Sequence, residues 1–405
     1  MADVTVASCR RHSGSVRIPA RPAGGQAQVT HARLAMVMLA LGCVRRSTPT
    51  EPPPPAAAED RAGIRCPTAY VLVGGRGTTA LPRPPTLSAL SMPTGTGPAA
   101  PGGVVRPGAG FVVTAERSVG ESRYVQIADG RWLPAVDLVR ARPSRFAGAV
   151  IPPGNPLRFG WVTVPESAVY RDPRPGAALI TTRPFHTRLT FAGDCQAGWC
   201  PLAVGWIRAW DLAIPTAALR PGAVGPVEPW LDVDLGSQTL VAYRGAEPVY
   251  ATLVSTGIGG LGSPLATPTG TFTIRSKHRL VRMDNLEHTG VVPYVYDVPL
   301  AQVFTDGKAL HAAPWHDRFG HPASHGCINL APADAEWLFA FTSPALPHGS
   351  SEIGATPTRV GTVLRVRGQL AGDCVGDVAR CRSHVPAPLS LRAAKPRYAR
   401  PNSGR

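Results

Sequence analysis

The residues best suited to chemistry lie within one short segment of the chain. Cys327 directly follows His325 and Gly326, Ser324 stands before this pair, and a further histidine, His311, lies upstream. A neutral thiol is a poor nucleophile, but a nearby imidazole can take its proton and leave a thiolate that attacks carbonyl carbon. Glycine permits a tight backbone turn, so that successive amide N–H groups can converge on a developing oxyanion. The segment therefore predicts acyl transfer by a cysteine nucleophile.

Other interpretations of this segment are weaker. Its histidines, together with Asp317 and Cys327, could ligate zinc, but structural zinc sites usually contain a second cysteine at short spacing, and none lies nearby. An inert, buried Cys327 would leave the flanking Ser-His-Gly and Asn unexplained. His316 and His321 are interpreted as ordinary loop or rim histidines. We therefore expect a catalytic cysteine, and neither a metal ion nor a cofactor.

The run Ser-His-Gly-Cys-Ile-Asn at residues 324–329, preceded by His311, resembles the signature of the L,D-transpeptidases with a YkuD-type catalytic domain. The resemblance implies that Cys327 is the nucleophile and His311 the general base. It also implies that His325 shapes the site, and that the amides of residues 325–327 form the oxyanion hole. Ala312 stands where many members of the family have Gly or Ser, so a hydrogen bond that orients His311 has to come from elsewhere, such as a backbone carbonyl.

Further residues take substrate-binding roles by the same resemblance. They are Ser324 and Asn329 beside the nucleophile, and Tyr294 and Tyr296 in the segment 278–299, which forms a lid beside the substrate groove in the family. The resemblance extends over roughly residues 228–367, because stretches such as Ser-Thr-Gly at 255–257 also recur in this domain.

The activity implied is cross-linking of peptidoglycan stem peptides. Cys327 would attack the carbonyl of the third residue of a tetrapeptide stem, expel terminal D-Ala and form a thioester. An amine of a second stem would then resolve the thioester and give a 3→3 cross-link. Hydrolysis of the acyl-enzyme (a carboxypeptidase) and attachment to a lysine of an envelope protein share this nucleophile and remain alternatives. A non-enzymatic wall-binding protein is a further alternative, which the complete Cys-His set disfavours. Carbapenems, which acylate the family, are expected to acylate Cys327.

Composition favours a mostly β fold. The chain of 405 residues contains 43 Gly and 44 Pro, and only 6% of its residues are aromatic. Such a composition favours many short strands joined by turns. The net charge of +16 suggests an anionic neighbour such as a wall polymer or a membrane surface, although scattered arginines alone could produce it. No basic-aromatic pattern of a nucleic-acid reader occurs, so we expect no nucleic-acid partner.

The N-terminal part predicts export. No Asp or Glu lies between residues 4 and 50, and an apolar run at 34–42 ends at Cys43. This pattern is typical of a signal peptide that is too short to span a membrane. Gly-Cys at its end resembles a lipobox, so residues 1–43 are interpreted as an over-long start followed by a lipoprotein signal with Cys43 lipidated. An ordinary signal peptide is the alternative. Either interpretation places the protein in the cell envelope, facing the periplasm.

The Pro-rich stretch 44–62 predicts an extended linker. Two small β modules are expected at 63–148 and 149–222. Each ends in a similar phrase, Gly-Arg-Trp-Leu with Asp-Leu at 130–138 and Gly-Trp-Ile-Arg with Asp-Leu at 205–212. These phrases resemble the ends of bacterial SH3-like domains. The alternative is ordinary β-sheet that does not form such a domain.

The catalytic domain is expected over residues 226–368, as a YkuD-type β-sandwich. Clean alternation at 231–235, 239–243 and 248–254, with turns between, predicts a β-meander. Residues 332–339, with Pro first and acids in the first turns, predict a helix after the nucleophile loop, and 363–366 predict a closing strand. The basic stretch 369–405 is expected to carry little structure.

The remaining cysteines fit an oxidising compartment. Cys195 with Cys200, and Cys374 with Cys381, are spaced for short hairpin disulfides. Cys66 is then left over, either free or paired with one of these cysteines.

Overall fold

Strands dominate this protein. The computed structural model describes residues 64–75, 77–81, 104–105, 107–260, 262–283 and 297–370. The chain divides into two units, Met1–Glu51 and Pro52–Arg405, and every described residue lies in the second. The described residues contain many strands and one α-helix, α3 (Pro332–Phe341), which follows the nucleophile loop. The prediction of a mostly β fold with a short helix at this place is confirmed.

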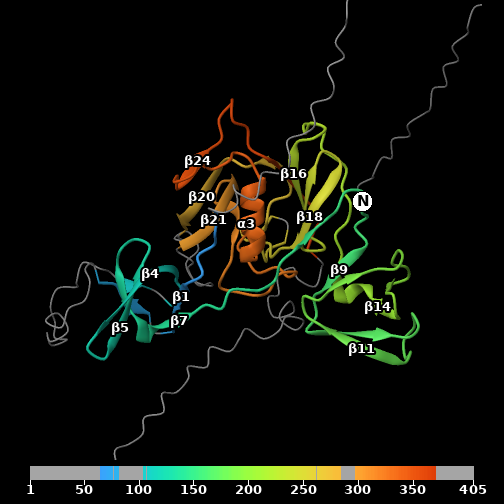
Figure 1. Cartoon of the computed structure of the whole chain (residues 1–405), viewed down its shortest axis with the longest axis horizontal. Coiled ribbons are helices and arrows are strands. Elements are labelled where there is room, and N and C mark those ends of the chain that lie inside the picture. Colours follow the sequence, from blue (N-terminus) through green and yellow to red (C-terminus); the bar gives the residue numbers. More distant parts are fainter. Residues whose placement is uncertain are drawn as a thin grey trace, which may run out of the picture. The chain divides into compact units, whose positions relative to one another are not determined.

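The first group of strands forms an antiparallel sheet in the order β6-β5-β4-β1-β7. Figure 1 labels β1, β4, β5 and β7 of this sheet. Its apolar core contains Val71, Phe111, Ile127 and Leu133. The strands are β1 (Tyr70–Val73), β4 (Gly110–Val119), β5 (Ser122–Ile127), β6 (Trp132–Pro134) and β7 (Leu138–Arg140), while β2 (Thr78–Thr79) and β3 (Val104–Val105) pair with each other.

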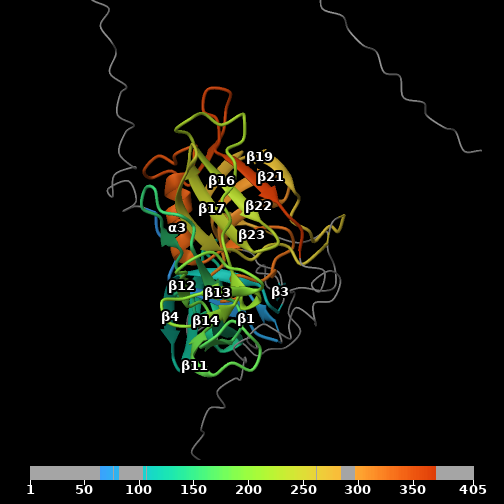
Figure 2. The ribbon, with the colours of Figure 1, turned by 90° about the vertical axis from the view of Figure 1, so that its right-hand side faces the viewer.

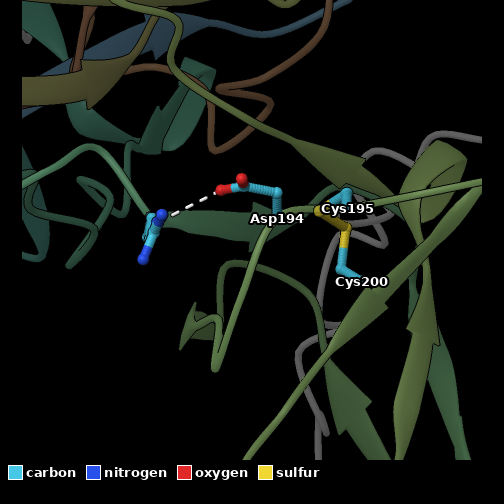
Figure 3. The surroundings of a disulfide bond; sticks show 4 residues. Asp194, Cys195 and Cys200 are labelled. Atoms are coloured by element: carbon cyan, nitrogen blue, oxygen red, sulfur yellow. Dashed lines mark ion pairs between the residues drawn. A yellow bond between two sulfur atoms is a disulfide. The ribbon is translucent and has the colours of Figure 1, made fainter.

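A second group forms two small sheets, in the orders β11-β10-β14-β13 and β12-β9-β15. The strands are β9 (Phe159–Val162), β10 (Glu166–Tyr170), β11 (Leu179–Pro184), β12 (Arg188–Thr190), β13 (Trp199–Pro201), β14 (Trp206–Arg208) and β15 (Leu212–Ala213). The structure joins Cys195 to Cys200 by a disulfide, and Arg158 pairs with the neighbouring Asp194 at 3.1 Å (Figure 3).

The two repeated sequence phrases have the same local structure. In the first, β6 leads through a 3₁₀ turn, Ala135–Asp137, into β7. In the second, β14 leads through a 3₁₀ turn, Ala209–Asp211, into β15. In both, the aspartate accepts a hydrogen bond from a hydroxyl of an earlier segment: Thr78 to Asp137 at 2.7 Å, and Ser167 to Asp211 at 2.6 Å. Their assignment as SH3-like modules stays a prediction.

The region predicted to be catalytic contains two larger sheets. The first has the order β19-β25-β16-β17-β18-β8 and the second β23-β22-β21-β20-β24. The meander predicted from alternation is observed as β16, β17 and β18, within one or two residues of the expected bounds. The strands are β8 (Ala149–Val150), β16 (Pro229–Asp234), β17 (Thr239–Arg244), β18 (Glu247–Leu253), β19 (Gly270–Thr273), β20 (Ser276–Arg282), β21 (Asp297–Thr305), β22 (Lys308–Ala312), β23 (Ile328–Leu330), β24 (Glu352–Gly354) and β25 (Val363–Arg367).

Helix α3 packs into one apolar core with both sheets. Leu338 of the helix shares this core with Leu231 of β16 and Leu310 of β22. Figure 1 shows α3 between the strands β20 and β21 and the strands β16 and β18. At its C-terminal end, the ammonium of Lys277 donates to the carbonyls of Phe339 and Thr342, which the last helical turn leaves without intrahelical partners.

The core of this region also recruits residues from before position 226. Cys66 is buried in the same cluster as Leu338, and its amide donates to Glu336 of α3 at 2.8 Å. The short strand β8 pairs with β18 and extends the six-stranded sheet. Cys66 carries a free thiol, and burial raises its pKa to about 12. Within the described part of the chain, no helix is long and apolar enough to cross a membrane.

Candidate active site

The base and the nucleophile expected from the sequence lie on neighbouring, parallel backbone segments. Strand β22 lies beside β23 (Figure 2). The two strands pair in the register His311 opposite Asn329, and Cys327 stands immediately before β23. The fold therefore places His311 beside Asn329, and Cys327 lies two residues before Asn329 in the chain.

The orientation of His311 is fixed by its own backbone neighbour. Its Nδ1 lies 2.9 Å from the carbonyl oxygen of Ala312. A carbonyl can only accept, so Nδ1 carries the proton and Nε2 is left with a lone pair. Burial lowers the pKa of His311 to about 4, with the Ala312 hydrogen bond acting in the opposite direction. The imidazole is thus neutral at pH 7 and able to take a proton at Nε2.

Cys327 is held as a thiol. Its side chain is half-buried, and Sγ lies 3.9 Å from the carbonyl oxygen of Gly307. Desolvation raises the pKa of this thiol, while a backbone hydrogen bond from Ala309 and the charge of Lys308 lower it. The pair is therefore a neutral thiol and a neutral imidazole, so the thiol would have to lose its proton in order to act as a nucleophile.

The turn before the nucleophile requires glycine. Gly326 has φ +105°, and a Cβ at this position would lie 2.6 Å from the carbonyl oxygen of Ala266. The hydroxyl of Ser324 donates to the carbonyl of Cys327 at 2.5 Å and accepts from the amide of Gly326 at 3.2 Å. In this structure Ser324 stabilises the turn, and the Gly326 amide that the sequence assigns to the oxyanion hole already has an internal partner.

His316 was interpreted from the sequence as an ordinary loop histidine, but in the structure it contacts Asn329, a residue expected at the site. Its Nε2 lies 3.0 Å from Nδ2 of Asn329, and its Nδ1 accepts from the amide of Arg318 at 3.2 Å. Desolvation, followed by the charges of Arg318 and His311, lowers the pKa of His316 to about 3. Asn329 itself is buried, and its Oδ1 has no hydrogen-bond partner.

These facts fix the tautomer of His316. Because Nδ1 accepts from a backbone amide, a neutral ring must carry its proton on Nε2. A proton there needs an acceptor, and Asn329 offers one if its amide is turned so that Oδ1 faces the ring. Amide oxygen and nitrogen are assigned from the hydrogen-bond network, so this orientation satisfies both the ring and the orphaned Oδ1.

The loop between His311 and Cys327 is contacted by residues that flank the upstream strands β9, β11 and β12. His321 Nε2 lies 2.6 Å from the carbonyl oxygen of Thr163, and His186 Nε2 lies 3.0 Å from that of Phe319. His321, which the sequence indicated to be an ordinary rim histidine, thus holds this loop against Thr163.

On its other side, the ring of Trp315 lies 5.7 Å from His311 and 5.5 Å from Tyr70 of β1, centroid to centroid. The hydroxyl of Tyr70 donates to the carbonyl of Asp297 at 3.0 Å. An aromatic contact therefore runs from β1 through Trp315 to the ring of His311.

Lys308 is a residue that sequence reasoning did not single out. Its Nζ donates to the carbonyl oxygens of His325, at 2.6 Å, and Pro264, at 3.3 Å. Its only sequence signal is its place at the start of the strand that carries His311.

Several expected residues lie outside the described part of the chain: Tyr294, Tyr296, Cys43, Cys374 and Cys381. Among the residues that are described, no three His, Cys, Asp or Glu side chains gather into a set that could hold a metal ion.

Residues 228–366 match the family model for the YkuD L,D-transpeptidase catalytic domain. The resemblance is confirmed for this part of the chain. L,D-transpeptidase 1 of Mycobacterium tuberculosis is 39% identical over 89 residues, which is 20% of this chain and 35% of the relative. The match thus spans about a third of that protein's length.

Two solved structures are similar to parts of the chain. The L,D-transpeptidase from Mycobacterium smegmatis is 24% identical with a TM-score of 0.28, over 44% of this chain and 82% of that one. The LD transpeptidase LdtMt1 in complex with imipenem is 20% identical with a TM-score of 0.28, over 55% of this chain and all (100%) of that one.

Proposed function

We propose that this chain is a cysteine acyltransferase that forms 3→3 cross-links between peptidoglycan stem peptides. The observation that carries the proposal is the hydrogen bond between His311 Nδ1 and the carbonyl of Ala312, at 2.9 Å. It leaves Nε2 as the base, on the strand that pairs with the one directly after Cys327.

The first half-reaction follows from these groups. Nε2 of His311 takes the thiol proton while Sγ of Cys327 attacks the carbonyl carbon of the third stem residue. The tetrahedral oxyanion is stabilised by the amides of His325 and Cys327, since the amide of Gly326 already donates to Ser324. The imidazolium then returns its proton to the leaving amine, so that D-Ala departs and a thioester remains on sulfur.

The second half-reaction needs a nucleophile from outside the chain. An amine of a second stem attacks the thioester, His311 takes the amine proton, and the thiol is regenerated as the new amide forms. Water in place of the amine gives a carboxypeptidase, and a lysine of an envelope protein gives protein attachment. Product analysis separates these outcomes, because only the cross-link joins two stems.

Acylation by a carbapenem tests the nucleophile. The full chain is incubated with imipenem and its intact mass is measured, beside the variants Cys327→Ala and Cys66→Ala. We expect one covalent adduct on the wild type and on Cys66→Ala, since Cys66 is buried and has a raised pKa. Cys327→Ala should carry none. An adduct on Cys327→Ala would overturn the proposed nucleophile.

Turnover tests the substrate. A disaccharide-tetrapeptide is supplied, and free D-Ala and linked dimers are followed by mass spectrometry. Release of D-Ala with dimer formation supports the transpeptidase, whereas release without dimer identifies a carboxypeptidase. No release from the wild type, with intact carbapenem acylation, would contradict the proposed substrate.

We further propose that the protein works in the cell envelope, facing the periplasm, and is anchored through a lipidated Cys43. The support is the apolar run that ends at Cys43, together with the disulfide between Cys195 and Cys200, which is typical of oxidising compartments. Fractionation of cells that express the wild type or Cys43→Ala tests the anchor. The wild type should enter the detergent phase and the variant should not. Equal solubility of both would leave an ordinary signal peptide.

A further inference from the structure

A lysine connects the nucleophile turn to the strand of the base. Lys308 begins β22, and its Nζ donates to the carbonyl of His325, the second residue before Cys327. A second, longer hydrogen bond reaches the carbonyl of Pro264 at 3.3 Å. The ammonium therefore ties two loops to the strand that carries His311.

The packing around Gly326 shows how closely this ammonium approaches the turn. A Cβ built on Gly326 would lie 2.8 Å from Nζ of Lys308. The lysine thus lies against the backbone between His325 and Cys327. It is half-buried, with part of its surface facing solvent.

Two of the histidines of the segment are neutral and do not duplicate the charge of this lysine. His311 and His316 both have pKa values lowered by burial, to about 4 and about 3, so both rings are neutral at pH 7. Arg318 is the other cation of this loop, and its charge acts on His316. Asp317 is an exposed residue that faces His186 at 3.6 Å. The charge of Lys308 acts on the thiol of Cys327 and lowers its pKa.

We propose that Lys308 is a positioning residue for the nucleophile, whose ammonium stabilises the thiolate of Cys327 and holds the turn through the His325 carbonyl. The inference deepens the proposed function, because it rests on Cys327 being the nucleophile. When the thiol passes its proton to His311, sulfur acquires a negative charge in a desolvated site. A fixed positive charge nearby lowers the free energy of that state without taking part in proton transfer.

The role divides into two contributions that different substitutions separate. Lys308→Met keeps much of the length and apolar stem but removes both the charge and the donor. Lys308→Arg keeps the charge and the ability to donate to carbonyl oxygens. If the charge of Lys308 stabilises the thiolate, Lys308→Arg should keep the wild-type pKa of Cys327, and Lys308→Met should raise it.

The test measures the thiol itself and does not require peptidoglycan. The full-length wild type, Lys308→Met and Lys308→Arg are alkylated with iodoacetamide across a pH series, and the rate at Cys327 is followed by peptide mass spectrometry. Arg275→Gln is the matched control, because Arg275 pairs with Asp306 at the β21–β22 turn and is exposed. Melting curves establish that each variant is folded.

We expect the apparent pKa of Cys327 to rise by about one unit in Lys308→Met, with roughly tenfold slower alkylation at pH 7. Lys308→Arg and Arg275→Gln should keep the wild-type profile. If folded Lys308→Met has the same pH profile of alkylation as the wild type, the proposal is overturned. Equal shifts of the Cys327 pKa in Lys308→Met and Lys308→Arg would also overturn it. Failure of the proposed transpeptidation leaves this measurement interpretable, since alkylation reports the thiol directly.

Discussion

Nδ1 of His311 donates to the carbonyl oxygen of Ala312, the next residue along β22, at 2.9 Å. The imidazole of the proposed base is thus oriented by a main-chain atom, and no side chain at position 312 is needed. We predict that His311→Gln lowers kcat/KM for D-Ala release by ~10²–10⁴, the usual contribution of a positioned base. Ala312→Gly keeps the carbonyl and should keep most of the activity. A large loss in Ala312→Gly, with normal folding, would show that the orientation depends on more than this carbonyl.

The pH profile should reflect the buried state of His311. The neutral imidazole is the active form, and its pKa in the fold is about 4, against 6.5 for an ordinary histidine. We therefore expect kcat/KM to remain high as pH falls from 7 to 5 and to drop near pH 4. The free energy of unfolding depends on pH in the same direction. The unfolded chain binds a proton at this histidine near pH 6.5 and the folded chain only near pH 4, so the stability that comes from the neutral imidazole is lost as pH falls through 4. An acid limb centred at 6.5 would be inconsistent with a desolvated base.

His316 should exist as the Nε2–H tautomer. Its Nδ1 accepts from the amide of Arg318, and Asn329 Oδ1 is the acceptor that its Nε2 proton needs. Nitrogen chemical shifts of the histidine side chains, compared with those of a His316→Gln variant for assignment, measure the tautomer directly. The Nδ1–H form would show that the Arg318 contact is absent in solution.

The glycine at the nucleophile turn should not tolerate a side chain. Gly326→Ala places a Cβ 2.6 Å from the carbonyl of Ala266, at φ +105°. Gly262→Ala is the matched control, since Gly262 also has positive φ (+82°) and has open space around its Cβ position. We expect the control to lose about 1 kcal/mol of stability from backbone strain, and Gly326→Ala to lose activity in addition. The measurements are thermal unfolding and carbapenem acylation; equal behaviour of the two variants would argue against the close approach.

The carboxylate of Asp334 in α3 is fully buried, and its removal should destabilise the fold. Its carboxylate accepts from Tyr250 at 2.6 Å, Thr252 at 2.5 Å and the amide of Gly148 at 2.7 Å. Asp334→Ala leaves these buried donors without an acceptor, and we expect a loss of ~2–4 kcal/mol in the free energy of unfolding. Asp306→Ala removes an aspartate that is 98% exposed and should change stability by less than about 0.5 kcal/mol.

The same carboxyl predicts a pH dependence of stability. Burial raises the pKa of Asp334 to about 6, against 3.8 for an ordinary aspartate. The folded state therefore holds this proton more tightly, and the contribution is present below pH 3.8 and lost as pH rises through 6. Urea unfolding of the wild type relative to Asp334→Asn should show this decline between pH 4 and pH 6. A constant difference would mean that the hydrogen bonds offset the desolvation.

Much of the catalytic region was predictable because its signals are local. Alternation located β16, β17 and β18, and Pro332 marked the start of α3. The motif around Cys327 identified a turn that glycine alone fits, as its φ shows.

What the sequence missed depends on contacts between distant residues. The sequence indicates only a loop histidine at His316, because its partner Asn329 lies on β23 and is distant in the chain. Lys308 has no motif of its own, and its role appears only once β22 lies against the nucleophile turn. The sequence left Cys66 either free or paired with another cysteine, whereas in the fold it is a free cysteine in the core against which α3 packs.

The anchors of the catalytic loop have a consequence for how the protein forms. Thr163 and His186, whose partners are His321 and Phe319, precede the loop in the chain, as does Tyr70, whose ring lies against Trp315. Chains are made from the N-terminus, and early segments fold while later ones are still being added. The part of the receiving surface that Tyr70, Thr163 and His186 supply is therefore synthesised before Cys327, whereas Asn329, the partner of His316, is synthesised after it. When the whole chain refolds from denaturant, all segments are present from the start, so the loop and the residues that contact it have to become ordered together.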